Sequence, residues 1–153
     1  IPASPVTGTR YCIFVFDSCR SGGMVKALNT SADASTPEWM KNFKPGLSRM
    51  ARNLSAAGYV VLMACDDTEY SYESTTLQNG VFTEFLCEGI ATRQADSNHD
   101  GLITAKEVFD YAGPRVGDYV SNHPGEFGPD AVQTPQLFAS PRELENVPIY
   151  RTP

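Results

Sequence analysis

The pattern of hydrophobic and polar positions along this chain contains two continuous apolar runs, Tyr11–Phe16 and Tyr59–Cys65. Each run is too short for a stable helix and is rich in β-branched and aromatic residues, which is typical of a buried strand. Between them, apolar residues recur at helical spacing over Leu47–Leu54, and Gly58 marks the end of that helix. The pattern predicts a βαβ unit with parallel strands, both buried on their two faces.

The second half of the chain alternates between helical patterns and polar segments. Apolar positions within Val81–Ile90 predict an amphipathic helix. Another helix is expected from Ala105, broken or kinked at Gly113–Pro114. The remainder is rich in proline and predicted to be irregular, with a short strand near Val147–Tyr150 at the sheet edge.

Proline and glycine residues predict two further boundaries in the first third of the chain. Residues 1–9 read as a loose N-terminal arm, so the part of the domain that this chain carries is expected over 10–153. A short helix is predicted over Glu38–Lys44, ended by Pro45–Gly46.

Composition and charge narrow the class of protein. The chain has 153 residues, enough for one domain with a core, and a net charge of -6. This acidity argues against nucleic acid or an anionic membrane as partner and favours a basic ligand. No apolar run approaches the length of a membrane span. The four cysteines lie in apolar patterns and read as reduced, which favours the cytoplasm.

The polar stretch after the first strand carries the most distinctive chemistry. Cys19 follows the end of the strand, beside Arg20, whose charge favours a thiolate, and before Gly22–Gly23, which free the backbone to turn. Ligands of open α/β sheets bind outside the carboxyl ends of the strands, so Cys19 is a candidate nucleophile. The alternative is a small buried residue, the usual fate of a free cysteine.

Carboxylates gather at the same predicted rim. Asp17 lies two residues before Cys19, and Asp66 and Asp67 follow the second strand. Paired carboxylates suit a basic side chain, because arginine offers a forked set of donors. The alternative is that the acids cap a helix or are merely solvated.

Several motifs together resemble the caspase-like cysteine peptidases, the group of caspases, metacaspases, paracaspases and their bacterial relatives. Asp17–Gly23 resembles the catalytic-cysteine segment, and Ala64–Asp67 the acidic end of a later strand in metacaspases. Gly80–Leu86 and Thr134–Phe138 resemble later segments of bacterial caspase domains, so the resemblance covers roughly residues 10–140. It implies a three-layer α/β/α fold with a mostly parallel sheet, incomplete in this chain.

The resemblance also implies roles for the rim residues. Cys19 would attack the scissile carbonyl, and Asp17, with Asp66 and Asp67, would form a pocket for Arg or Lys of a peptide or protein substrate. True caspases cut after Asp with basic pocket residues, and Arg20 alone beside three acids does not favour that specificity.

Histidine is where the chain departs from the family pattern. A cysteine peptidase needs a general base, and in caspase-like enzymes this His precedes the Cys by roughly 50 residues. No His precedes Cys19, and neither His99 nor His123 matches the family position. We therefore expect the Cys-bearing fragment of a processed enzyme, with the catalytic His in a separate upstream piece of the same precursor. The alternative is a calcium-binding, inactive homologue that acts as an interaction module.

A calcium-loop pattern of the EF-hand type occupies residues 96–107. The predicted ligands, at loop positions 1, 3, 5, 7 and 12, are Asp96, Asn98, Asp100, the carbonyl of Leu102, and Glu107. Gly101 stands at the sharp turn and Thr104 at the ninth position. Because calcium sensors usually pair such loops, we expect a single structural Ca²⁺. The alternative is a calcium-free turn in which Thr104 and Glu107 form a capping box.

Overall fold

In the computed structural model, residues 11–17, 43–66 and 69–151 are described, with the side chains of α3 described from residue 48 onward. The helices are α3 (Phe43–Ala56), α4 (Val81–Ala91), α5 (Ala105–Asn122) and α6 (Pro124–Phe127), with a 3-10 turn at Arg142–Asn146. The strands are β1 (Ile13–Phe16), β2 (Val60–Met63), β3 (Glu73–Ser74), β4 (Asn79–Gly80), β5 (Leu102–Thr104), β6 (Gln136–Phe138) and β7 (Pro148–Arg151).

The central sheet has the strand order β1-β2-β6 among the described residues. β1 and β2 are parallel, with Ile13 opposite Val60 and Phe16 opposite Met63, so the predicted βαβ unit is confirmed. β6 pairs antiparallel with β2 on the other side, with Leu62 opposite Leu137. The described sheet therefore contains one parallel and one antiparallel pair, and the larger, mostly parallel sheet stays a prediction.

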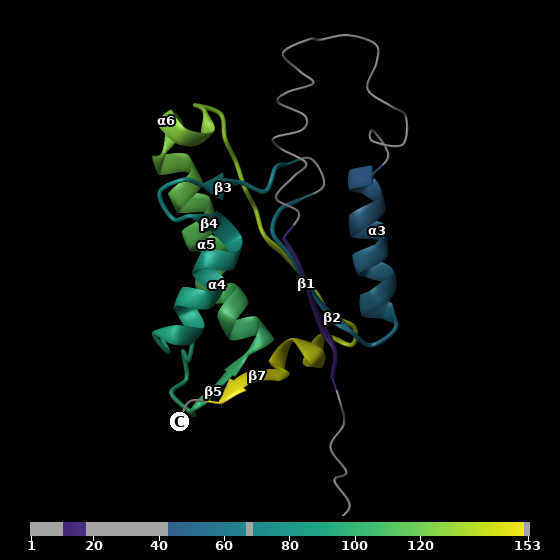
Figure 1. Ribbon diagram of the computed structural model, residues 1–153. Coiled ribbons are helices and arrows are strands. Elements are labelled where there is room, and N and C mark those ends of the chain that lie inside the picture. The colour runs from purple at the N-terminus through teal and green to yellow at the C-terminus, as the bar shows by residue number, and fades with distance from the viewer. Residues whose placement is uncertain (1–10, 18–42, 67–68, 152–153) are drawn as a thin grey trace, which may run out of the picture.

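Helices lie on both faces of this sheet (Figure 1). Ala51 of α3 packs with Val61 and Met63 on one face. Leu62 and Ala64 point to the opposite face, where they join the larger core of α4 and α5. This alternation follows from the period of two along a strand, which sends successive side chains to opposite faces.

The two parallel strands differ in burial, which corrects one prediction. β2 is buried along its whole length, as expected. β1 was predicted to be buried on both faces, but Tyr11 and Val15 are 48% and 49% exposed. β1 lies at the edge of the described sheet and lacks a neighbour there among the described strands, which accounts for the exposure.

Three other features of the fold differ from the sequence prediction. α3 continues through Pro45–Gly46, because proline is tolerated in the first turn of a helix. α5 continues through Pro114 without a break, supported by its buried face against α4. β7 pairs with β5 in a separate sheet and not with the edge of the central sheet.

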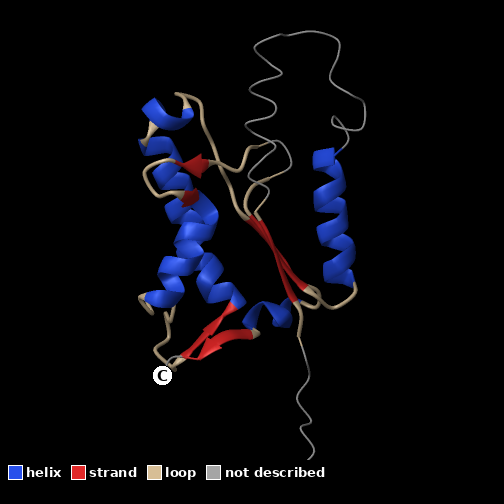
Figure 2. Cartoon of the chain, in the orientation of Figure 1, coloured by secondary structure: helices blue, strands red, loops and turns tan. Residues whose placement is uncertain are grey.

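Helices α4 and α5 run between two opposite ends of the molecule (Figure 2). α4 starts beside the carboxyl ends of β1 and β2, and α5 returns there after the loop of residues 92–101. That loop lies at the opposite end, next to β5 and β7. No helix among the described residues is long and apolar enough to cross a membrane.

Candidate active site

Asp17 is fixed at the carboxyl end of β1 by two hydroxyl groups. Ser71 Oγ donates to Asp17 Oδ1 at 2.7 Å. Thr83 Oγ1, in the first turn of α4, donates to Asp17 Oδ2 at 2.5 Å. Because both carboxylate oxygens accept a bond, the side chain is held in one orientation at the carboxyl end of β1.

A cavity of about 650 Å³ opens at this end of the sheet. Its lining residues are Asp17, Glu73, Ser74, Thr75, Gln78, Asn79, Gly80 and Thr83. We call it the Asp17 cavity. Two carboxylates line it, from Asp17 and Glu73, and no basic residue is among its described lining residues. The cavity is therefore suited to a cationic group.

The β3–β4 hairpin that forms one wall is held from α6. Glu126 Oε1 accepts bonds from the amide and the hydroxyl of Thr75 at 2.6 and 2.8 Å. Ser74 Oγ donates to the same carboxylate at 3.1 Å. Desolvation alone would raise the pKa of Glu126, but the bonds from Thr75, followed by those from Ser74 and the amide of Thr76, lower it. Glu126 is thus a positioning residue for this wall.

His123 lies at the junction of α5 and α6, behind the same wall. Its ring stacks on Tyr119 with centroids 4.0 Å apart, and its Nδ1 lies 2.7 Å from the Tyr119 carbonyl oxygen. Tyr119 Oη lies 3.1 Å from Ser74 Oγ. His99 belongs instead to the loop between α4 and β5, and this loop lies at the other end of the molecule (Figure 1). Of the two histidines, His123 is therefore nearer the Asp17 cavity.

The acids after β2 are placed differently from Asp17. Asp66 follows β2 at the same rim but is not among the described lining residues of the Asp17 cavity. Glu69 binds the C-terminal segment, accepting from Thr134 Oγ1 at 2.8 Å. Cys19 and Asp67 lie outside the described residues. The proposed roles of Cys19, Asp66 and Asp67 stay predictions.

A buried glutamine fixes the segment after β2. Gln133 is 1% exposed, donates to the Ala64 carbonyl at 2.9 Å and accepts from the Tyr72 amide at 3.0 Å. It thereby ties the end of β2 to the segment that carries Ser71 and Glu73. Sequence analysis did not identify Glu73, Ser71, Thr83 or Gln133, because their polar side chains fit surface loops and helix starts equally well.

The described cysteines, Cys12, Cys65 and Cys87, form no disulfide with one another, and only Cys65 is buried as predicted. Cys65 is buried and its Sγ makes a weak bond to the Glu69 carbonyl at 3.7 Å. Cys12 and Cys87 are exposed, so the prediction of apolar packing for them was wrong. These exposed thiols offer controls for the chemistry proposed for Cys19.

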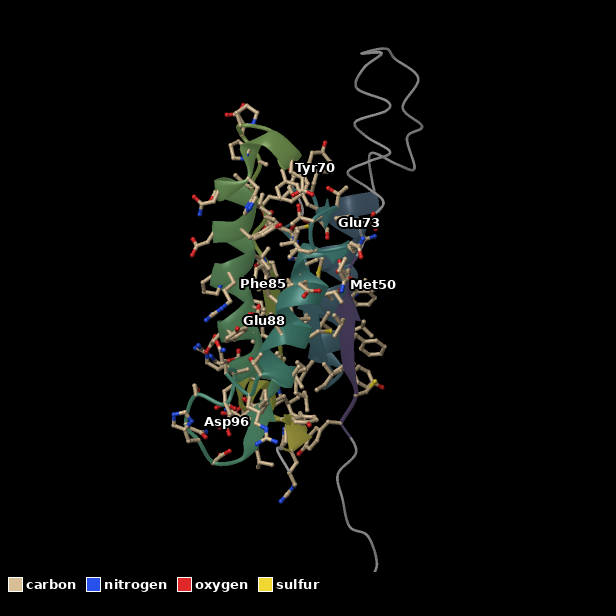
Figure 3. The ribbon with its side chains drawn as sticks, turned by 60° about the vertical axis from the view of Figure 1, so that its left-hand side comes forward. Met50, Tyr70, Glu73, Phe85, Glu88 and Asp96 are labelled. Atoms are coloured by element: carbon tan, nitrogen blue, oxygen red, sulfur yellow. The ribbon has the colours of Figure 1, made fainter. Side chains whose placement is uncertain are left out.

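Figure 3 shows Asp96 at the end of the molecule opposite Tyr70 and Glu73. In its loop, Thr104 and Glu107 form a capping box at the start of α5, as the calcium-free alternative predicted. Desolvation alone would raise the pKa of Glu107, but bonds from the backbone and hydroxyl of Thr104, then Ser97 and Asn98, lower it. No three His, Cys, Asp or Glu side chains in the described part of the chain converge as a ready metal site.

Comparison with known families gave one informative match. A family model described as a caspase domain matches residues 3–143. The comparisons with curated proteins and with solved structures gave no significant match. The match covers most of the 153 residues, including β1, β2 and the Asp17 cavity. The chain therefore belongs to the caspase domain family of cysteine peptidases.

Proposed function

We propose that this chain carries the nucleophile, Cys19, of a cysteine endopeptidase that cuts after Arg or Lys. The observation that supports this most is the pair of carboxylates, Asp17 and Glu73, in one cavity at the carboxyl end of β1. Cys19 is two residues from Asp17 in the sequence. A basic side chain held in the cavity would present its own carbonyl carbon to the thiolate.

The hydrogen bonds around Asp17 fit this role. The hydroxyls of Ser71 and Thr83 hold the carboxylate in one orientation, as a pocket for a basic side chain requires. A guanidinium has five donors in a planar fork, and charge-assisted bonds to carboxylates are about twice as strong as neutral ones. Asp66 and Asp67 would add negative potential at the same rim.

The general base would come from a second piece of the same precursor. This piece would pair with β1, whose outer edge meets no other described strand. Beside β1 lies an apolar hollow of about 380 Å³, lined by Tyr11, Ile13 and Val15 of the β1 segment and by apolar residues of β2, α4, α5 and β7. Apolar side chains of the added piece would fill this hollow, joining the two pieces through one core.

Each step of peptide-bond cleavage would then be carried out by a specific group. The His of the upstream piece takes the proton of Cys19, the thiolate attacks the carbonyl carbon, and the same His protonates the leaving amine. Water hydrolyses the acyl-enzyme and regenerates the thiol. An inactive homologue, the alternative from the sequence, would lack this turnover altogether.

Substrate selectivity tests the cavity. Asp17→Asn and Glu73→Gln in the full protein should each lower kcat/KM for arginyl reporters by roughly 10- to 100-fold, the worth of a lost charge-assisted bond. Reporters with a neutral residue at that position should change far less. Glu88→Gln, which removes a charge from α4 outside the Asp17 cavity, is the matched control. Preference for aspartyl reporters, or equal loss on all reporters, would contradict the proposed pocket.

Intact mass and native gel analysis of material from the full gene tests the two-piece arrangement. We expect two species that migrate together, one of them bearing the upstream His. A single active species of only residues 1–153 would overturn this arrangement and direct attention to His123, which lies behind the wall of the Asp17 cavity.

A further inference from the structure

One buried carboxylate oxygen stands out at the end of the molecule opposite the Asp17 cavity. Asp96 is 8% exposed, and its Oδ1 has no hydrogen-bond partner among the described residues. Its other oxygen, Oδ2, accepts from the Gly101 amide at 3.1 Å. Burying an ionised oxygen without a partner is costly, so such an atom is expected to meet a donor or a cation.

The loop around Asp96 brings further oxygens to the same turn. Asn98 Oδ1 accepts from the Asp100 amide at 2.8 Å, and Asp100 Oδ1 accepts from the Leu102 amide at 2.8 Å. Gly101 has a φ of 82°, a conformation that glycine adopts without strain and that reverses the chain here. Figure 3 shows Asp96 within the curve of this loop.

We propose that the loop of residues 96–107 binds one Ca²⁺, with Asp96 Oδ1 as its buried ligand. Asn98, Asp100, the carbonyl of Leu102 and Glu107 would complete the set. In the structure Glu107 instead accepts from Thr104 and Ser97, at 2.9 and 3.1 Å for the two hydroxyls. Its carboxylate would turn toward the ion, which explains why the ligands do not yet converge.

The chemistry of the proposed ligand atoms indicates which metal ion would bind. Every proposed ligand atom is an oxygen, which favours a hard cation over zinc or copper. A set of protein oxygens that includes one carboxylate able to bind through both oxygens suits Ca²⁺, whereas Mg²⁺ demands a near-ideal octahedron and keeps its waters. Calcium is therefore the ion expected to bind.

Ion binding should also order the C-terminal strand. Leu102, which supplies the carbonyl, lies opposite Arg151, and Ile103 lies opposite Tyr150 in the β5–β7 pair. The Ala105 amide donates to the Val147 carbonyl at 2.9 Å. A fixed loop would hold β5 in place, and through these bonds β7. The ion would act as a clamp between the α4–α5 connection and β7.

Thermal melting of the full protein in calcium and in chelator tests the site. At a calcium concentration about 100 times its Kd, the wild type should melt about 5–10 °C higher than in chelator. Asp96→Asn should lose that shift, yet melt at or above the wild type in chelator, because it removes the unpaired charge. Magnesium at the same concentration should give a smaller shift.

Asp110→Asn is the matched control. Asp110 is exposed on α5, pairs with Lys106 at 2.6 Å and lies outside the loop, so its calcium shift should match that of the wild type. Glu107→Gln, which can keep the capping box, should change melting little in chelator and reduce the calcium shift. Calorimetric titration should give one ion per chain, and amide exchange of residues 148–151 should slow in calcium. Equal melting of the wild type in calcium and chelator, or an unchanged shift in Asp96→Asn, would overturn the proposal.

Discussion

The two ends of the molecule are built in opposite ways. At the Asp17 cavity, side chains from β1, the segment after β2, the β3–β4 hairpin and the start of α4 meet, although Asp17 and Thr83 are 66 residues apart. At the proposed calcium loop, every proposed ligand lies within 96–107. The cavity therefore depends on the tertiary fold, whereas the loop depends on local turns.

The two ends should therefore contribute different properties to the protein. Groups that meet only in the folded chain can recognise a substrate when the domain is intact, so changes at the cavity should alter selectivity. A local loop that would clamp α4, α5 and β7 when it holds the proposed ion should affect stability instead. Helices α4 and α5 connect the two ends. Thr83 of α4 lines the cavity and Tyr119 of α5 contacts Ser74 of its wall, whereas the C-terminus of α4 and the N-terminus of α5 flank the loop.

The largest expected effect is at the nucleophile. Cys19→Ala should lower peptidase activity by about 10⁴-fold or more, because no other group forms the acyl-enzyme. Its calcium-dependent melting should stay that of the wild type, since the loop lies at the other end. Cys87→Ala, which removes an exposed thiol of α4, is the control and should keep full activity. Normal turnover by Cys19→Ala would refute the assignment.

The next effect tests the packing that connects the two ends. A Cβ at Gly89 of α4 would come within 2.6 Å of Tyr111 Cδ1 on α5. Gly89→Ala should therefore lower the free energy of unfolding by about 1–3 kcal/mol. At Gly113 the nearest atom would be 4.0 Å away, so Gly113→Ala should stabilise the helix, by up to about 1 kcal/mol. Denaturant unfolding of both variants checks this, and equal effects would show that α4 and α5 are not in close contact.

The smallest effect concerns the wall of the Asp17 cavity. The folded-state pKa of Glu126 is lowered, so its contribution to stability is present above the ordinary value of 4.5 and is lost as the pH falls through the folded-state value. Glu126→Gln should remove this part of the pH dependence. Melting temperatures of the variant and wild type should therefore differ at pH 6 and converge in acid. Glu143→Gln, at an exposed position, should follow the wild type throughout.

Features that depend on local contacts could be predicted from the sequence, whereas features that depend on contacts between distant residues could not. The parallel strands β1 and β2 and helix α4 were predicted, and the capping box at Thr104 was named as the alternative to a calcium loop, because each is encoded by neighbouring residues. β6 was missed, since Gln136–Phe138 is short and gains its place only by pairing with β2. The exposure of Val15 was missed too, because an apolar run looks the same whether or not a further strand covers it.

The residues of the candidate site show the same contrast between what the sequence could and could not predict. Asp17 was predicted from its distance to Cys19 in the sequence, but its partners Ser71 and Thr83 were not. Glu73 gave no signal, because an acid in a polar loop is usually solvated. Only the fold brings these residues together, so the cavity could not have been derived from spacing alone.

The central claim is that Cys19 attacks beside a pocket for basic residues. We would treat the full protein with a peptidyl-arginyl chloromethyl ketone and with its aspartyl counterpart, and map the adducts by mass spectrometry. The arginyl reagent should modify Cys19 alone, much faster than the aspartyl reagent, and Asp17→Asn should slow that reaction. Faster modification by the aspartyl reagent, or arginyl adducts on Cys12 or Cys87 in place of Cys19, would contradict the claim.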